Sequence, residues 1–229
     1  MITTNVLQRV FQIKVGVALG TGFSIDVKGK QYLVTASHVV GALSGTTEIE
    51  LFHDGQWKSL GVTVIGRYNP DEIDVAVLGP HKPLTHPKFA MEPSCGVAYG
   101  QDVYFLGFPY GLAGNLGEIN RNFPAPFVKK AVVSCLPAGF SGAQVFYLDG
   151  HNNPGFSGGP VVFTEPGQTE FKVAGLISGY RQEMNPVYEG DAPTSLQHGS
   201  NTGIVICYMI KHALDAIHLS PAGYDLSKV

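Results

Sequence analysis

A serine hydroxyl stands inside a run of glycines and prolines at residues 153–160, which read NPGFSGGP. Serine is a poor nucleophile until a neighbouring base removes its proton. Glycine leaves the backbone free to bend, so the N–H groups of Gly155 and Ser157 can turn toward one point. Two such donors stabilise the negative charge that develops on oxygen during acyl transfer. The segment therefore predicts a reactive serine, Ser157, in a loop that carries its own anion-binding donors.

Candidate partners for Ser157 lie upstream in the chain. His38 follows the apolar stretch LVTAS, and Asp74 opens the apolar stretch DVAVL. Histidine most often serves as the base for a serine, and a carboxylate orients that histidine. Taken alone, each residue also has a structural explanation: a satisfied histidine, a capping aspartate or a glycine-rich turn. The three together, in the order His38, Asp74, Ser157, favour a catalytic triad.

The elements that must position these side chains are short strands. About a dozen apolar runs are separated by turns rich in glycine and proline, with almost no helix between them. This pattern predicts an all-β chain of two small barrels rather than alternating strands and helices. Apolar periodicity thins between about residues 107 and 122. We therefore expect an N-terminal barrel over residues 1–110, with His38 and Asp74, and a C-terminal barrel over residues 111–229, with Ser157.

One helix is predicted near the C-terminus. Ile210, Ala213, Leu214 and Ile217 follow helical spacing, and Ser220-Pro221 ends the pattern. We expect this apolar stripe to pack on the second barrel. A helix that binds a partner protein is the alternative.

The composition excludes several classes of function. A net charge of −3 gives no basis for binding nucleic acid or an anionic membrane. No apolar run is long enough to span a membrane, and the N-terminus lacks the pattern of a signal peptide. We expect no metal and no cofactor, since His81 and His86 have no Cys or carboxylate at ligand spacing.

Three isolated cysteines cannot all pair within one chain, which favours a reducing compartment, the cytoplasm. Cys135 and Cys207 lie in apolar strands and are expected to be core thiols. An excised or mature form of a longer protein is the alternative to a chain made without a signal peptide.

Several stretches resemble the chymotrypsin-fold serine proteases, and within that fold the HtrA/Deg branch. The residues TASH at 35–38, DVA at 74–76 and NPGFSGGP at 153–160 match the motifs around the base, the acid and the nucleophile. GFPYGL at 107–112 resembles the segment between the two barrels, and VAGLIS at 173–178 resembles the strand beside the substrate. The resemblance implies two six-stranded antiparallel β-barrels with a C-terminal helix.

The resemblance also implies an activity. The chain is expected to be a trypsin-like serine endopeptidase that forms an acyl-enzyme, with Gly155 and Ser157 as the oxyanion hole. Residues that resemble those framing the substrate pocket are His151, Asn152, Ser178, Gly179 and Tyr180. No carboxylate is among them, so we expect a small or medium uncharged residue before the cut bond. For His151, packing of the second barrel is an equal alternative. Ser178 is further expected to hydrogen-bond near the acid.

The sequence departs from the family's pattern in two places. Phe156 stands where digestive relatives carry an aspartate that pairs with a newly cleaved N-terminus. We expect Phe156 to hold the loop by apolar packing, or to leave it inactive until a substrate or partner binds. From the length of the sequence we also expect no C-terminal PDZ domain of the kind that HtrA/Deg relatives carry. Two alternatives to the endopeptidase therefore stay open: a module that only binds peptides, and a protease switched on by a regulatory protein partner.

Overall fold

Two closed β-barrels make up most of the molecule in a computed structural model that describes residues 1–137 and 142–229. The strands of the first barrel follow the order β3-β2-β1-β4-β5-β6, and pairing of β3 with β6 closes the ring. A short strand near the C-terminus, β16, is added outside β3. The strands are β1 (Val10–Val15), β2 (Ala18–Val27), β3 (Lys30–Thr35), β4 (Thr46–His53), β5 (Gln56–Arg67), β6 (Ala76–Pro80) and β16 (Tyr224–Asp225).

The second barrel has the order β13-β8-β11-β12-β15-β14 and closes through β13 and β14. A short strand, β7, is added in parallel to β14. The two six-stranded antiparallel barrels predicted from the sequence are thus confirmed. The strands are β7 (Glu92–Pro93), β8 (Asp102–Gly107), β11 (Phe127–Cys135), β12 (Val145–Asp149), β13 (Pro160–Thr164), β14 (Phe171–Glu189) and β15 (Ala192–Met209).

Short elements connect the strands. A two-stranded ribbon of β9 and β10 lies in the segment between the barrels. The remaining elements are α1 (Thr4–Leu7), α2 (Ser37–Val40), α3 (Lys211–Leu219), β9 (Gly114–Asn115), β10 (Pro124–Ala125) and the 3-10 helices η1 (Pro87–Phe89), η2 (Pro109–Gly111), η3 (Gly117–Asn120) and η4 (Leu226–Lys228).

The chain passes from the first sheet to the second between β6 and β7. β8 therefore belongs to the second sheet, although it precedes residue 110. The physical reason is that β8 pairs with β11 and β13, and a strand's partners decide its sheet. The domain bounds 1–110 and 111–229 stay a prediction.

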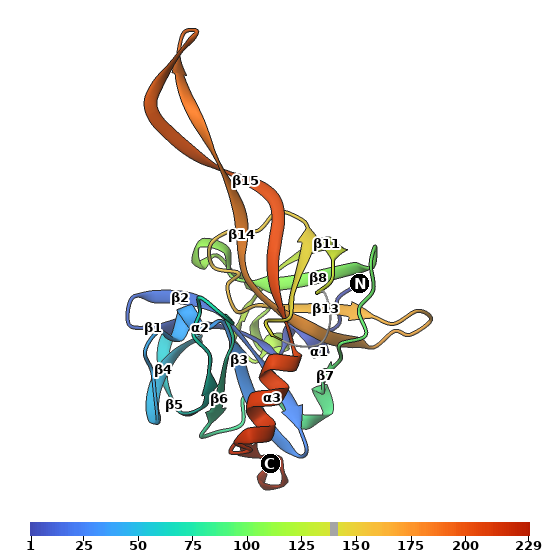
Figure 1. The fold of residues 1–229 in the computed structure, drawn as a ribbon. Coiled ribbons are helices and arrows are strands. Elements are labelled where there is room, and N and C mark those ends of the chain that lie inside the picture. The colour runs from blue at the N-terminus through green and yellow to red at the C-terminus, as the bar shows by residue number, and fades with distance from the viewer. Residues whose placement is uncertain (138–141) are drawn as a thin grey trace.

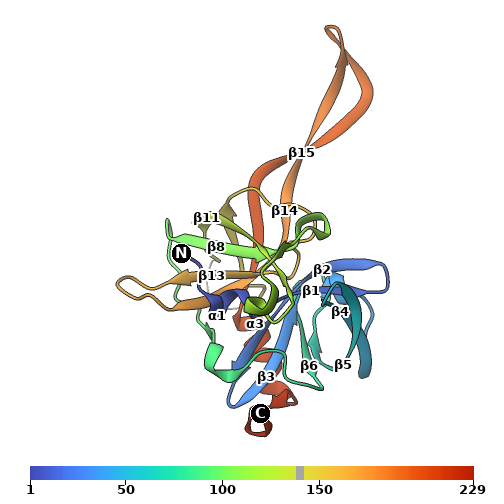
Figure 2. The same ribbon diagram turned by 180° about the vertical axis from the view of Figure 1, so that it is seen from behind.

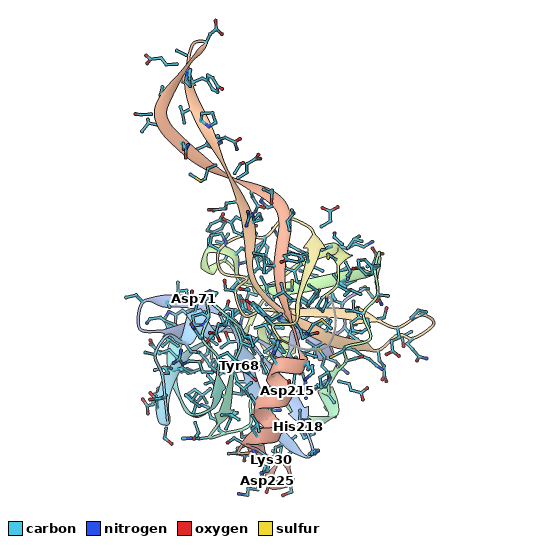
Figure 3. All side chains as sticks on the ribbon, viewed as in Figure 1. Lys30, Tyr68, Asp71, Asp215, His218 and Asp225 are labelled. Carbon is cyan, nitrogen blue, oxygen red and sulfur yellow. The ribbon has the colours of Figure 1, made fainter. Side chains whose placement is uncertain are left out.

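Helix α3 packs on the first barrel, and the expectation that it covers the second barrel was wrong. Ala213, Ala216 and Ile217 are buried, and the strands that α3 lies against are β5 and β6 of the first barrel. A Cβ atom on Gly66 of β5 would lie 2.7 Å from the Ala216 side chain, so helix and strand are in close contact. The hydroxyl of Tyr68 donates to the carbonyl of His212, and Tyr68 lies beside the helix in Figure 3. Helical periodicity shows which face of a helix is buried, but it does not say against which surface.

The cysteines differ in part from the expectation. Cys207 is buried as predicted, but Cys135 is exposed, and Cys95 is exposed as well. Cys135 is the last residue of β11, and a register shift between Val133 and Cys135 interrupts the alternation of buried and exposed residues just before it. All three thiols are free.

A long two-stranded arm projects from the second barrel. β14 and β15 continue beyond the barrel and pair with each other as far as Glu189 and Ala192. Figure 1 and Figure 2 show this ribbon standing away from both barrels. None of residues 183–200 is buried. The arm therefore adds no residue to either core.

Candidate active site

His38 and Asp74 meet at one end of two paired strands. β3 and β6 are antiparallel, with Thr35 opposite Ala76. His38 lies in α2, just after β3, and Asp74 lies just before β6. The register therefore brings both residues to the same end of the barrel. The Nδ1 atom of His38 lies 2.7 Å from Oδ2 of Asp74, and the backbone N–H of His38 donates to Oδ1 at 2.9 Å.

Asp74 is buried but well supplied with donors. Ser178 donates its hydroxyl to Oδ2 of Asp74 at 2.6 Å, the contact expected for it. Burial by itself raises the pKa of Asp74, but the hydrogen bonds and charge of His38 and the hydroxyl of Ser178 lower the pKa below its ordinary value overall. Asp74 is therefore a stable anion next to an imidazole whose side chain is 44% exposed toward solvent.

Ser157 joins this cluster through Ser178. Its hydroxyl donates to the backbone carbonyl of Ser178 at 3.2 Å. Ser178 thus contacts Ser157 with its carbonyl and Asp74 with its hydroxyl. Ser178 therefore links the candidate nucleophile to the candidate acid, whereas among the described residues no hydrogen bond joins Ser157 to His38.

The loop before Ser157 has two backbone carbonyls that are held by fixed partners. Tyr110 N–H donates to the carbonyl of Pro154 at 2.9 Å, and Gly159 N–H donates to the carbonyl of Phe156 at 2.8 Å. In a planar trans peptide, C=O and N–H point in opposite directions. The N–H groups of Gly155 and Ser157 are therefore turned away from these partners. Within residues 1–137 and 142–229 neither N–H has an acceptor.

Glycine is required at two places in this loop. Gly155 has a φ of +102°, and a Cβ there would collide with the carbonyl oxygen of Phe108. Gly158 has a φ of +81°, and a Cβ there would collide with the carbonyl oxygen of Thr21. The glycines that stood out in the sequence thus allow both the loop's bend and its close approach to the first barrel.

Thr21 is a residue that sequence reasoning missed. It is fully buried in β2. Its hydroxyl donates to the carbonyl of Gly155 at 2.7 Å, and its N–H donates to the carbonyl of Ser157 at 2.9 Å. The first barrel therefore holds the nucleophile loop of the second at two points. The available signal was a lone threonine between glycines, Gly20 and Gly22, at the start of an apolar strand.

Phe156 is fully buried in the core of the second barrel. Its ring makes an edge-to-face contact with the ring of Phe105, with the ring centroids 5.1 Å apart and an angle of 72° between the ring planes. Such a pair adds about 1 kcal/mol beyond the burial of apolar area. The contacts agree with the expectation that Phe156 holds the loop by apolar packing.

Two of the residues expected to frame the substrate pocket are hydrogen-bonded to each other. Asn152 is almost fully buried, and its side-chain amide donates to the carbonyl of Gly179 at 3.1 Å. Asn201 donates to the carbonyl of Asn152 at 2.7 Å. His151 is exposed and does not pack the barrel interior, whereas Tyr180 is half-buried.

The described residues hold neither a metal-binding cluster nor a membrane-spanning helix. No group of three or more His, Cys, Asp or Glu residues in the described ranges is arranged to hold a metal ion. No helix in this part of the chain has the length and apolar character that crossing a membrane requires.

The family is decided by the sequence itself. Residues 20–168 match the profile of the trypsin-like peptidase domain, and this range contains His38, Asp74 and Ser157. The chain belongs to the trypsin-like peptidase family. It is a serine endopeptidase of that family.

Solved structures share the fold of this trypsin-like peptidase. An inactive form of Rv3671c from M. tuberculosis H37Rv superposes with a TM-score of 0.59 at 20% sequence identity, covering 95% of this chain and 88% of that one. The HtrA-type protease AlgW, solved with a tripeptide, gives a TM-score of 0.58 at 20% identity over 94% of this chain. The match spans 60% of the AlgW chain. A search of the curated proteins found no match.

Proposed function

We propose that Ser157, His38 and Asp74 form the catalytic triad of this serine endopeptidase, with the N–H groups of Gly155 and Ser157 as its oxyanion hole. The observation that carries the proposal is the shared contact of Ser157 and Asp74 with Ser178, next to an imidazole already hydrogen-bonded to Asp74. Asp74 holds Nδ1 of His38, so Nε2 is the nitrogen left to accept a proton.

The proposed reaction proceeds by two acyl transfers. The hydroxyl of Ser157 turns from the Ser178 carbonyl to Nε2 of His38, gives up its proton and attacks the peptide carbonyl. The resulting oxyanion accepts hydrogen bonds from Gly155 and Ser157. His38 returns the proton to the leaving amine, and an acyl-enzyme remains on Ser157. Water, deprotonated by His38, then attacks the ester, and the carboxylic acid leaves as Ser157 recovers its proton.

The proposed substrate is an extended segment of a protein or peptide. β13 pairs with β14 only as far as Leu176. Beyond that point, Ile177 exchanges backbone hydrogen bonds with Gly158 and Gly159. From Ser178 onward β14 pairs only with β15 among the described residues. The Ser178 carbonyl accepts from Ser157 and the Gly179 carbonyl from Asn152, but no second described strand pairs with Ser178 to Tyr180. A substrate segment can therefore add along Ser178 to Tyr180 as a further strand once Ser157 turns to His38.

We propose a small or medium uncharged residue before the cut bond. Asn152 and Gly179, both expected to line the pocket, are hydrogen-bonded to each other, and we infer that this leaves little room for a long side chain. His151, Asn152, Ser178, Gly179 and Tyr180 include no carboxylate that would pair with Arg or Lys. A peptide library digested by the protein should be cut after Ala, Val or similar residues. Cleavage mainly after Arg or Lys would overturn this specificity.

The decisive experiment compares the wild type with Ser157→Ala on an unfolded protein substrate, with mass spectrometry of the products. We expect cleavage by the wild type and none by the variant. A fluorophosphonate probe should label the wild type at Ser157, because labelling requires an activated hydroxyl. A purified protein that is folded but neither cuts nor reacts would favour a peptide-binding module, or a protease that needs a regulatory partner.

The oxyanion loop favours activity without such a partner. Its carbonyls are held by Tyr110, Gly159 and Thr21, so both N–H donors are already turned away from internal acceptors. The compartment proposed for the protein is the cytoplasm, on the basis of three free thiols. Thiol alkylation of the protein in intact cells should modify Cys95 and Cys135, whereas an intermolecular disulfide would contradict this location.

A further inference from the structure

We propose that Lys129 is a positioning residue of this peptidase: its ammonium group clamps the loop that carries the oxyanion donors. The inference rests on the proposed function, because the loop matters only if Ser157 is the nucleophile. Lys129 touches no reacting atom. It acts through the residues that carry the oxyanion donors.

Three contacts join this ammonium to the loop. Nζ of Lys129 donates to the carbonyl of His151 at 2.6 Å and to Oδ1 of Asn153 at 2.5 Å. It also lies 5.3 Å from the centroid of the Phe156 ring, over its face. A cation at this distance is attracted by the ring's electrons. One side chain therefore contacts the loop at three positions between His151 and Ser157.

The contacts to Asn153 extend the clamp. The side-chain amide of Asn153 donates to the hydroxyl of Tyr110 at 3.3 Å. The backbone carbonyl of Asn153 accepts from the N–H of Phe156 at 3.3 Å. Tyr110 N–H in turn holds the carbonyl of Pro154. Asn153 is thus fixed by Lys129 and by the same tyrosine that orients the Gly155 peptide. Moving Asn153 would disturb the donor at Gly155.

The ammonium group of Lys129 donates its hydrogen bonds to the loop and to no carboxylate in the described part of the chain. Lys129 has no carboxylate partner within the described residues, whereas the next residue, Lys130, pairs with Asp102 at 2.7 Å. Burial lowers the pKa of Lys129, as expected for an ammonium that loses water. Hydrogen bonds from a partly desolvated cation are stronger than those from a solvated one. A lysine that only contributes to solubility would point into solvent and would not make two hydrogen bonds and a ring contact with one loop.

The test is Lys129→Met, with Lys130→Met on the same strand as the matched control. Methionine keeps most of the apolar stem and removes the ammonium. We expect kcat on a short peptide amide to fall about 10- to 100-fold in Lys129→Met, because losing one oxyanion donor outright costs about 100- to 1,000-fold. KM should change less than about threefold. Lys130→Met should retain the wild-type kcat, since its ion pair is exposed.

A pH profile separates the clamp from a merely structural role. The wild-type kcat should fall at alkaline pH as Lys129 loses its proton below the ordinary lysine range. Lys129→Arg should keep part of the activity and lose this alkaline limb, because arginine stays charged. The Arg profile also gives an answer if Lys129→Met fails to fold.

The outcomes distinguish the clamp from the proposed function. If wild type and Lys130→Met are inactive and unlabelled by fluorophosphonate, the proposed function fails. If they are active, but Lys129→Met keeps the wild-type kcat or Lys129→Arg keeps the alkaline limb, the clamp is overturned.

Discussion

At the residue scale, the site is organised around Ser178. Its carbonyl accepts from Ser157 at 3.2 Å, and its hydroxyl donates to Asp74 at 2.6 Å. A hydrogen bond to a charged group contributes more than one between neutral groups. Ser178 therefore supports the ionised form of Asp74 and, through it, the orientation of His38.

Removing that hydroxyl should weaken the site in a pH-dependent way. The folded protein has a lowered Asp74 pKa, so the stability from this group is present above pH 3.8 and is lost as pH falls through the folded pKa. Ser178→Ala should raise that pKa and move the loss to higher pH. We expect a fall in kcat/KM of about tenfold at neutral pH and a stability loss of about 2 kcal/mol. Steady-state kinetics at neutral pH and urea unfolding from pH 8 down to below pH 3.8 measure the two effects.

The matched control for this serine is Ser59→Ala, which removes a hydroxyl bound to the exposed carboxylate of Glu48 at 2.8 Å. This change should leave activity unaltered and stability within about 0.5 kcal/mol of the wild type. A Ser178→Ala variant as active as Ser59→Ala across the pH range would show that Asp74 needs no support from Ser178.

At the element scale, the loop between β12 and β13 depends on its backbone conformation. Gly155→Ala should lower kcat about 100-fold or more, because a Cβ there collides with the carbonyl of Phe108 at a φ of +102° and displaces an oxyanion donor. Gly167→Ala is the control, since Gly167 has a similar φ of +77° with no neighbour within 4 Å of the added Cβ. The control should cost about 1 kcal/mol of stability and no activity. Equal kinetics of the two variants would contradict the assignment.

Helix α3 should make stability sensitive to mild acid through His212. Its Nε2 accepts a hydrogen bond from the N–H of Gln144 at 2.8 Å, and burial lowers its pKa from 6.5, with opposing effects of Asp215 and Lys211. The rings of Tyr68 and Tyr208 also face it. The unfolded chain therefore binds this proton at higher pH than the folded protein does. The stability from neutral His212 is present above pH 6.5 and is lost as pH falls below it.

Thermal unfolding at pH 7.5 and pH 5.5 tests this dependence. The wild-type Tm should be lower at pH 5.5, and His212→Gln should reduce the difference between the two values. His218→Gln is the control, because His218 lies on the same helix but is exposed. If the His212 and His218 variants retain the same pH dependence as the wild type, another group is responsible.

At the scale of the whole molecule, the arm is separable from the two barrels. Residues 183–200 contribute no buried side chain, and Met184, Tyr188 and Leu196 are exposed. An isolated two-stranded hairpin has little stability of its own. The barrels and the active site should therefore fold without it.

Replacing residues 184–199 by Asn-Gly tests this independence. Glu183 and Ser200 are directly paired, so a two-residue turn can join them. Asn201, which holds Asn152, is kept. The Tm should change by less than about 5 °C and kcat/KM on a short peptide by less than about threefold. A large loss of either would show that the arm supports the barrels or the pocket.

Much of this protein could be predicted from its sequence, because the signals are local. Strands require only apolar runs bounded by turns, and the loop around Ser157 requires particular glycines at fixed offsets. The resemblance of the three motifs to known proteases then identified the residues that the fold brings together.

Tertiary structure alone decided the contacts between distant segments. No sequence motif singled out Lys129 or Thr21, yet the side chains of both are hydrogen-bonded to the loop that carries Ser157. The sequence periodicity of α3 showed a buried face but left its partner, the first barrel, undetermined. Propensity and periodicity depend on neighbours within a few residues, whereas these contacts depend on which distant segments the folded chain brings together, within one barrel for Lys129 and between the barrels for Thr21.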